Sequence, residues 1–376
     1  MALEILSVAY VVSDLCCSLR CSHSPNAIGS VSLLDLPDPC LLAVLRCCAD
    51  DPRSLFSAAR SHSRLRQAAV LAASSIRAVV QQQQRLDSVL HYLSNYGEHV
   101  GSLDLESVDR GVCIRQLPHD KLQGLSSLNF SGLRLQLQPG DGFQGVLGAG
   151  VLIKQLQFDT CRLLEGEPGL WQPGGLAAAL SLLPELHHLS FVNTCFDKSG
   201  WLWLPRRLPL QQLTYFELAA CPISIDERVG LEFLSSLTSL HELHIQCDCA
   251  HTIKASNLAG MHILTCLKFG EYLGSGCSCE PGILACKSQL GHVEMPNTNL
   301  IGGSVGTTAS EFLSHLQGMQ QLTYLDIRNS LDTSEPHPPA AAYSVITASS
   351  KLQHLDIRYS TLPTGVWQPA ACVPCW

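Results

Sequence analysis

The chain has 376 residues and a formal net charge of −8, and 15% of its residues are charged. An average soluble domain has about 25% charged residues. Because the charge is low and acidic and no basic cluster is present, the composition argues against a nucleic-acid partner. The apolar runs stay short of the roughly 18–20 residues that cross a bilayer, so we also expect no membrane span.

The first thirty residues predict a poorly defined N-terminal segment. Residues 5–12 are apolar, but Glu4 precedes them and Asp14 follows. A secretory signal needs a basic leading region and a small-residue cleavage site, and neither is present. We expect an intracellular chain, cytoplasmic and possibly nuclear, with secretion as the alternative.

Residues 31–80 predict a small all-α module. Pro37 follows a turn, and Leu41, Leu42, Val44 and Leu45 give the next segment one apolar face, as in an amphipathic helix. A second helix is expected from Ser54. About fifty residues bury too little surface to be very stable alone, so the module gains from a partner or from docking on the rest of the chain.

The order of residues in this module resembles an F-box. Leu36-Pro37, Leu41-Leu42 and Val44-Leu45 are followed by an acidic turn that leads to Leu55. The resemblance implies binding to a Skp-type adaptor of a cullin–RING ubiquitin ligase complex. It assigns that contact to Leu36, Pro37, Leu41, Leu42, Val44, Leu45 and Leu55. Residues 58–65 hold no Trp, unlike the family's usual pattern, so a helical cap closing the end of a repeat array is the alternative.

Residues 81–99 predict a linker helix that ends at Tyr96, before Gly97.

From Val100 onward one pattern recurs: an apolar residue, two variable residues, an apolar residue, one variable residue and an apolar residue. Its ten copies begin at Val100, Leu125, Ile153, Leu186, Leu213, Leu240, Leu264, Leu290, Leu322 and Leu352.

This pattern is typical of leucine-rich repeats. It predicts an α/β solenoid, a horseshoe of about ten units over residues 100–376, preceded by the small all-α module. The chain as a whole resembles F-box leucine-rich-repeat proteins of the green plant and algal type. Each unit is expected to hold a strand followed by a helix, with helices in residues 174–183, 229–237, 309–319 and 340–347.

Strand alternation sends the fourth and sixth positions of each unit inward and leaves their neighbours in columns on the concave face. In the last two units we expect Tyr324 to stack on His354 and Asp326 on Asp356, with the Arg residues that follow pairing diagonally. Exposed Tyr and Arg are favoured binding anchors. We expect the concave face to bind a protein through Tyr215, Glu217, Glu242, His244, Tyr324, Asp326, Arg328, His354, Asp356 and Arg358. A solvated ion-pair lattice without a partner is the alternative.

No pattern in the chain predicts catalysis. The 15 His residues are scattered, and phosphate-loop, zinc-protease and nucleophile-elbow motifs are missing from the sequence. The close pairs Cys247/Cys249, Cys277/Cys279 and Cys372/Cys375 have poor spacing or stand alone, so reduced structural thiols are expected instead of a metal site. Cys161 and Cys221 fall where a small buried residue turns the chain after a strand. We expect a non-enzyme without cofactors.

Together these patterns favour a substrate-receptor subunit of a Skp–cullin–F-box ubiquitin ligase, with an unknown protein substrate on the concave face. Such a receptor acts by raising the local concentration of its target. The alternative is a leucine-rich-repeat scaffold with no ubiquitin role, located at the cytoskeleton or a ciliary axoneme.

Overall fold

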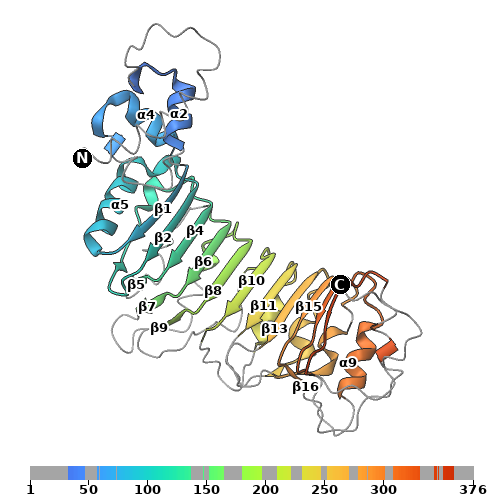
Figure 1. Ribbon diagram of the computed structural model, residues 1–376. Helices are drawn as coiled ribbons and strands as arrows, with labels where there is room; N and C mark the ends of the chain where they lie inside the picture. Colours follow the sequence, from blue (N-terminus) through green and yellow to red (C-terminus); the bar gives the residue numbers. More distant parts are fainter. Residues whose placement is uncertain are drawn as a thin grey trace, which may run out of the picture. The chain divides into compact units, whose positions relative to one another are not determined.

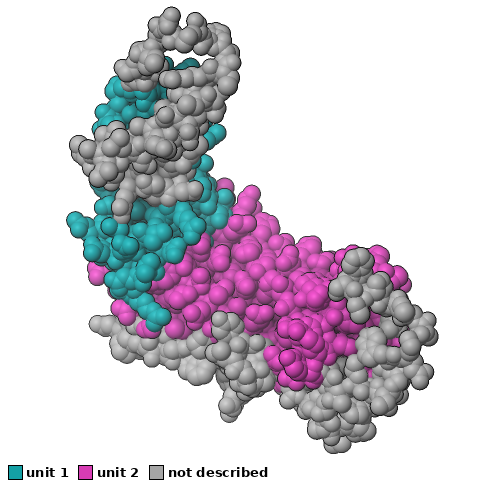
Figure 2. All heavy atoms as spheres, in the orientation of Figure 1, with its two compact units in different colours: residues 1–112, 118–128 teal, residues 113–117, 129–376 magenta. Residues whose placement is uncertain are grey.

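The computed structural model divides into two compact units, residues 1–112 with 118–128 and residues 113–117 with 129–376 (Figure 2). The description covers residues 33–46, 57–58, 60–72, 74–136, 147, 152–164, 180–196, 210–221, 231–246, 252–270, 278–285, 287–300, 308–330, 343–344, 346 and 350–359.

Within these residues the main element is a parallel sheet of eleven strands that follow one another in sequence order (Figure 1). Neighbouring strands pair in register, position for position, as in the pairs Leu243 with Leu267 and Leu325 with Leu355. The strands are β1 (Ser75–Val80), β2 (Ser102–Ser107), β4 (Ser127–Ser131), β6 (Gln155–Asp159), β8 (His188–Val192), β10 (Tyr215–Ala219), β11 (Glu242–Gln246), β13 (Cys266–Gly270), β15 (His292–Glu294), β17 (Tyr324–Asp326) and β18 (His354–Asp356).

The sheet begins one strand earlier than the sequence predicts. Residues 75–80 were assigned to the helical module, but they form β1, which pairs in parallel with β2. Ile76, Ala78 and Val80 are buried and the residues between them are exposed, which is the alternation of a strand with one face in the core. The repeat pattern did not include this strand because Ala stands where the other units have a large apolar residue.

Strand alternation builds the core as expected. The fourth and sixth positions are buried in every unit but the last, where Leu355 and Ile357 are partly exposed. Aromatic rings stack on one another at the sixth position of three successive strands. The ring centroids of Phe130 and Phe158 lie 5.8 Å apart, and those of Phe158 and Phe191 lie 5.1 Å apart. Because a single unit leaves its apolar side open, each strand depends on its neighbours for this burial.

A repeated pair of hydrogen bonds closes the turns after β6, β8, β10, β15 and β17. Thr160 and Asn193 have φ values of 54° and 47°, and their backbone N–H groups donate to carbonyls of the next strand. The residue that follows donates back to the sixth position of the preceding unit: Cys161 Sγ to the Phe130 carbonyl at 3.2 Å, and Thr194 Oγ1 to the Phe158 carbonyl at 3.2 Å. Cys221, Thr298 and Ser330 repeat this contact with Phe191, Phe269 and Met295.

These contacts confirm the buried structural role predicted for the thiols of Cys161 and Cys221, both of which are fully buried. Burial raises the pKa of each thiol to about 12, so both remain protonated donors at neutral pH. Of the three close Cys pairs, only Cys279 lies within the described residues, where it is buried.

Short strands form two smaller parallel sheets away from the main one. One has the order β3-β5-β7-β9 and the other β12-β14-β16. Their strands are β3 (Cys113–Ile114), β5 (Arg134–Gln136), β7 (Arg162–Leu164), β9 (Cys195–Phe196), β12 (Thr252–Ile253), β14 (Ser278–Cys279) and β16 (Asn299–Leu300).

The helices expected between strands are only partly found. Helix α9 (Thr308–Leu316) confirms one of them, whereas the described part of residues 229–237, which begins at 231, holds the short 3₁₀ segment η4 (Glu232–Ser236) instead of an α-helix. The predicted helices in residues 174–183 and 340–347 lie largely outside the described residues. The remaining helical elements are η1 (Leu33–Asp35), α2 (Asp38–Arg46), α4 (Ser63–Ala72), α5 (Gln83–Tyr96), η2 (Gly97–His99), η3 (His119–Lys121), α8 (Ala255–Leu258) and η5 (Pro281–Leu284).

Helices α2 and α4 pack together in the first unit. Arg64 of α4 ties them by donating to the Leu36 carbonyl at 2.6 Å and to the Asp38 carboxylate at 2.6 Å. The helix expected before Gly97 is α5, which ends at Tyr96; it connects β1 to β2 and so lies within the repeat array instead of before it. No helix in the described part of the chain is long and apolar enough to cross a membrane.

Candidate functional site

The outward face of the main sheet carries the polar side chains that alternate with the core. In its middle, β10, β11 and β13 contribute a central cluster, which consists of Tyr215, Glu217, Glu242, His244 and Cys266. The register places Tyr215 beside Glu242 and Glu242 beside Cys266, with Glu217 beside His244. Five functional groups thus meet across three strands because the backbone pairing is strict.

One hydrogen-bonded chain orients the His244 ring. The Tyr215 hydroxyl donates to Glu217 Oε2 at 3.1 Å, because a carboxylate only accepts. The same hydroxyl lies 3.0 Å from His244 Nδ1, and with its only proton given to Glu217 it accepts the Nδ1–H. Ser190 Oγ also donates to Glu217 Oε2, at 2.7 Å. His244 therefore carries its proton on Nδ1 and presents the lone pair of Nε2.

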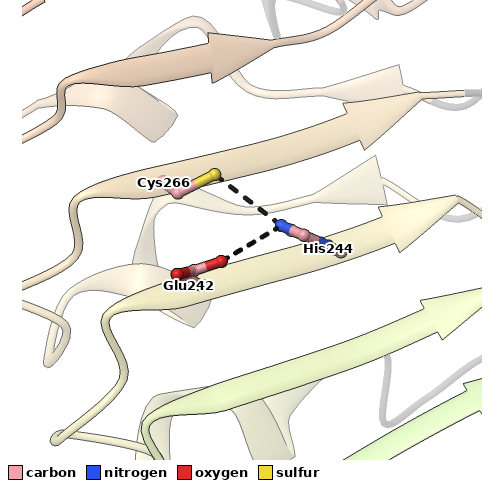
Figure 3. A group of neighbouring side chains, drawn as sticks. All are labelled: Glu242, His244 and Cys266. Carbon is pink, nitrogen blue, oxygen red and sulfur yellow. Dashed lines mark hydrogen bonds and ion pairs between the residues drawn. The ribbon is translucent and has the colours of Figure 1, made fainter. Parts of the chain in front are cut away.

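The lone pair of Nε2 faces a thiol and a carboxylate. Cys266 Sγ lies 3.7 Å from His244 Nε2, Glu242 Oε2 lies 3.8 Å from the same nitrogen, and both groups approach it from one end of the ring (Figure 3). The side chain of His244 is only 12% exposed, whereas that of Glu242 is 48% exposed. The three groups thus form a small site that is covered at the ring and open to solvent at the carboxylate.

Burial sets the protonation states in this cluster. Burial, aided by the charge of Lys268, lowers the pKa of His244 against the opposing effect of nearby carboxylates, which favours the neutral ring at neutral pH. Burial and then the Glu242 charge raise the pKa of Cys266 to about 11, so its thiol is protonated. Burial likewise lowers the pKa of His188, whose ring stacks on Tyr215 with centroids 3.9 Å apart.

A terminal cluster occupies the same columns on β15, β17 and β18 and the residues that follow them. Its first column is a stack of three nearly parallel rings. The ring centroids of His292 and Tyr324 lie 4.1 Å apart, and those of Tyr324 and His354 lie 4.2 Å apart. The stack confirms the predicted placement of Tyr324 on His354. The cluster comprises His292, Tyr324, Asp326, Arg328, His354, Asp356 and Arg358.

The charged half of the terminal cluster contains two ion pairs, Arg328 with Asp326 and Arg358 with Asp356, which we call the Asp–Arg forks. Arg328 lies 2.8 Å from Asp326 on its own strand and 3.4 Å from Asp356 on the next strand. Arg358 lies 2.7 Å from Asp356. The diagonal pair from Arg328 to Asp356 was predicted, but the shorter pairs within each strand were not. The hydrogen bond from Arg358 lowers the pKa of Asp356.

All ten residues predicted on the outward face lie on or beside neighbouring strands of this sheet, and they fall into the two clusters. Asp326 differs from the expectation of an exposed column, because it is 1% exposed beneath its Arg partner. The prediction omitted Cys266, His188, His292, Lys268 and Glu294. Lys268 and Glu294 lie between the clusters, with 3.6 Å between Nζ and Oε2. The repeat register alone identifies all five positions.

The predicted adaptor-binding residues are divided by burial. Leu41, Val44 and Leu45 are buried in the helical module, where they hold the two helices together. Leu36 and Leu42 are partly exposed and Pro37 is exposed. Leu55 lies outside the described residues. The accessible part of the motif therefore consists of Leu36, Pro37 and Leu42.

The in-register parallel strands, the inward apolar columns and the closed turns define a solenoid-like α/β repeat fold of the leucine-rich-repeat type. No family model matches the chain, and no curated protein matches it.

Solved structures that resemble the chain include an internalin from Listeria monocytogenes. The two are 16% identical, the match covers 81% of this chain and 87% of the internalin chain, and the TM-score is 0.42. TLR13, solved in a complex with ssRNA13, is 14% identical over 77% of this chain and 40% of its own, with a TM-score of 0.48. Drosophila Toll, solved in a complex with Spatzle, is 11% identical over 76% and 36%, with a TM-score of 0.42. The chain thus spans less than half the length of the last two.

Proposed function

We propose that this chain is a non-catalytic binding protein that holds a protein ligand on the outward face of its main sheet, with the terminal cluster as the principal contact. The supporting observation is the stack of His292, Tyr324 and His354 beside two ion-paired guanidinium groups. Three parallel rings and two fixed forks present a rigid aromatic and charged surface, which loses little side-chain freedom on binding.

The exposure of the Arg residues fits this role. The side chain of Arg358 is 65% exposed and that of Arg328 is 35% exposed, although each is held by a carboxylate. Arg and Tyr are common binding anchors at protein interfaces because they combine a large contact area with directed hydrogen bonds. A ligand with acidic and aromatic side chains matches this surface best.

The test compares the full-length chain with the double variant Tyr324→Ala/Arg358→Ala as bait in quantitative affinity capture. A ligand of this face should be captured by the wild type, be depleted at least roughly tenfold by the double variant, and rebind the wild type as a purified protein. The matched control is Arg77→Ala, which removes a guanidinium that is 61% exposed on β1. An unchanged set of captured proteins in the double variant contradicts the proposal.

A second candidate is narrower: the substrate receptor of a Skp–cullin–F-box ubiquitin ligase. It is favoured by the helix pair α2 and α4, which precedes the first strand and leaves Leu36, Pro37 and Leu42 accessible. In this case an adaptor binds the helix pair while the outward face holds the target. The competing candidate is a cytoskeletal or ciliary scaffold that uses the same face without an adaptor.

Co-elution separates the two candidates. The full-length chain mixed with a Skp-type adaptor should co-elute at micromolar concentrations, and Leu42→Arg should abolish co-elution because Leu42 sits on the accessible side of α2. Val108→Arg is the control, since Val108 is 72% exposed elsewhere in the first unit. Separate elution of the wild type removes the ligase role and leaves the binding role of the sheet untouched.

A further inference from the structure

The central cluster contains a set of side chains with the composition of a metal site. Glu242, His244 and Cys266 each offer one ligand atom, and these three atoms all lie within 4.8 Å of one another. No local sequence spacing joins them, since Cys266 comes from β13 and the other two come from β11. The register between the strands brings them together, and Figure 3 shows the thiol and the carboxylate at the same end of the imidazole.

The distances fit a small tetrahedral ion. Zinc lies roughly 2.3 Å from sulfur and roughly 2.0–2.1 Å from nitrogen or oxygen, which puts tetrahedral ligands about 3.3–3.6 Å apart. His244 Nε2 lies 3.7 Å from Cys266 Sγ and 3.8 Å from Glu242 Oε2. The thiol sulfur and the carboxylate oxygen lie within 4.8 Å of each other. Closing the site therefore needs a movement of up to roughly 1.2 Å, which the half-exposed side chain of Glu242 can make by changing its rotamer.

A second, independent observation is the orientation of the His244 ring. In metal sites the ligating histidine usually donates its other ring N–H to a partner, which fixes the tautomer and aims the lone pair. Tyr215 provides that partner at Nδ1, and Glu217 in turn holds the Tyr215 hydroxyl. Together the two interactions direct Nε2 at the thiol and the carboxylate.

The charge of the surroundings is compatible with a divalent cation. The Lys268 charge on β13 acts on His244, but Lys268 is ion-paired with Glu294 on β15, with 3.6 Å between Nζ and Oε2. Glu242 contributes a negative charge, and zinc deprotonates a coordinating thiol outright, which adds a second. The ligand set would then match the charge of the ion.

We propose that Glu242, His244 and Cys266 form a Zn²⁺ site with water in the fourth position, and that Tyr215 is its positioning residue. Sulfur, nitrogen and oxygen ligands together favour zinc over the harder magnesium and calcium ions. The open side at Glu242 leaves room for the water. This site is distinct from the proposed protein-binding contact at the terminal cluster, and each can exist without the other.

The experiment titrates the full-length reduced chain with Co²⁺ as a spectroscopic probe and then displaces it with Zn²⁺. One equivalent of Co²⁺ should produce the near-ultraviolet charge-transfer band of a cobalt–thiolate bond, and Zn²⁺ should abolish it. Cys266→Ser should remove the band. Glu242→Gln, a change at a half-exposed side chain, should weaken Co²⁺ binding at least roughly tenfold.

The chain has 18 Cys residues, so matched controls are required. Cys40→Ser removes an exposed thiol on α2, and Glu232→Gln removes an exposed carboxylate on η4; both should bind Co²⁺ as the wild type does. Tyr215→Phe keeps all three ligands, and it should weaken Co²⁺ binding roughly tenfold while retaining the charge-transfer band. Unchanged affinity and an unchanged band in Cys266→Ser, or failure of the wild type to bind Co²⁺, overturns the proposal.

Discussion

The central and terminal clusters occupy the same columns of one sheet, yet they handle charge in opposite ways. In the central cluster burial favours a neutral imidazole and a protonated thiol, and a Tyr hydroxyl links the groups. In the terminal cluster Arg358 holds Asp356 in its charged form. The backbone therefore fixes where side chains meet, whereas burial in one cluster and a guanidinium partner in the other decide their protonation.

The difference separates two kinds of binding. A neutral ring beside a thiol and a carboxylate suits a small cation, because coordination replaces weak contacts with direct bonds. Paired guanidinium groups beside stacked rings suit a larger, polar partner, because they are already held in position.

The largest effect is expected from Phe269→Ala, which removes a ring that is 1% exposed on β13, between the two clusters. Deleting a buried Phe side chain costs about 3–5 kcal/mol because transfer free energy is lost and a cavity remains. Urea unfolding measures the change. Lys268→Ala, on the neighbouring outward position, should cost much less. Equal costs would contradict the inward and outward assignment of both clusters.

Next comes the hydrogen bond that closes each turn. Thr194→Val keeps the shape of the side chain but leaves the Phe158 carbonyl without the Thr194 hydroxyl, which donates at 3.2 Å in a buried position. Losing one partner of a buried hydrogen bond costs about 1–3 kcal/mol. Thr194→Ser is the control that keeps the hydroxyl. A Val variant as stable as the Ser variant would show that the turn needs no such bond.

A smaller effect should distinguish the ring stacks. His188→Ala removes a half-buried ring that stacks on Tyr215 with an interplanar angle of 5°, whereas His354→Ala removes an exposed ring at the end of the terminal stack. Aromatic pairs contribute about 0.5–1.5 kcal/mol beyond buried area, and we expect this for His188 and less for His354. Thermal unfolding of both variants gives the comparison, and a reversed order would contradict it.

The smallest effect concerns pH. The folded-state pKa of Asp356 is lowered from 3.8, so this group stabilises the fold above pH 3.8 and loses its contribution as the pH falls through the folded value. In Asp356→Asn the free energy of unfolding should fall less steeply below about pH 4 than in the wild type. The difference should be no more than about 1 kcal/mol, since ion pairs near the surface are weak. Glu232→Gln, at an exposed carboxylate, is the control. Urea midpoints measured from pH 2.5 to 6 provide the measurement, and an unaltered decline in the Asn variant contradicts the assignment.

The sequence predicted the part of the fold that depends on side-chain period. Large apolar residues at fixed spacing placed the strands from Val100 onward, and alternation then placed Tyr324 on His354 without any structural knowledge. Strand β1 was not predicted because the small Ala78 weakens the apolar pattern, although Ile76 and Val80 fit it. The segment at η4 was taken for an α-helix because its apolar spacing fits both a helix and a 3₁₀ turn.

The candidate site was predicted less completely, for a geometric reason. The sequence prediction of metal sites rested on Cys residues that are close in sequence. Cys266 and His244 are 22 residues apart in sequence and are brought together by the pairing of their strands. The forks within strands were missed because the prediction compared neighbouring strands only. The burial of Asp326 beneath Arg328 depends on the rotamers of both side chains, which the repeat pattern does not encode.

The constant register from β8 to β18 has a genetic consequence. Each unit advances the sheet by one strand spacing of about 4.8 Å, so duplication or loss of a whole unit leaves the backbone of every other unit intact. Such an event changes only which side chains become neighbours at the junction. Exchange of DNA segments between repeats therefore supplies new surface chemistry in single steps, without requiring a new core for each one.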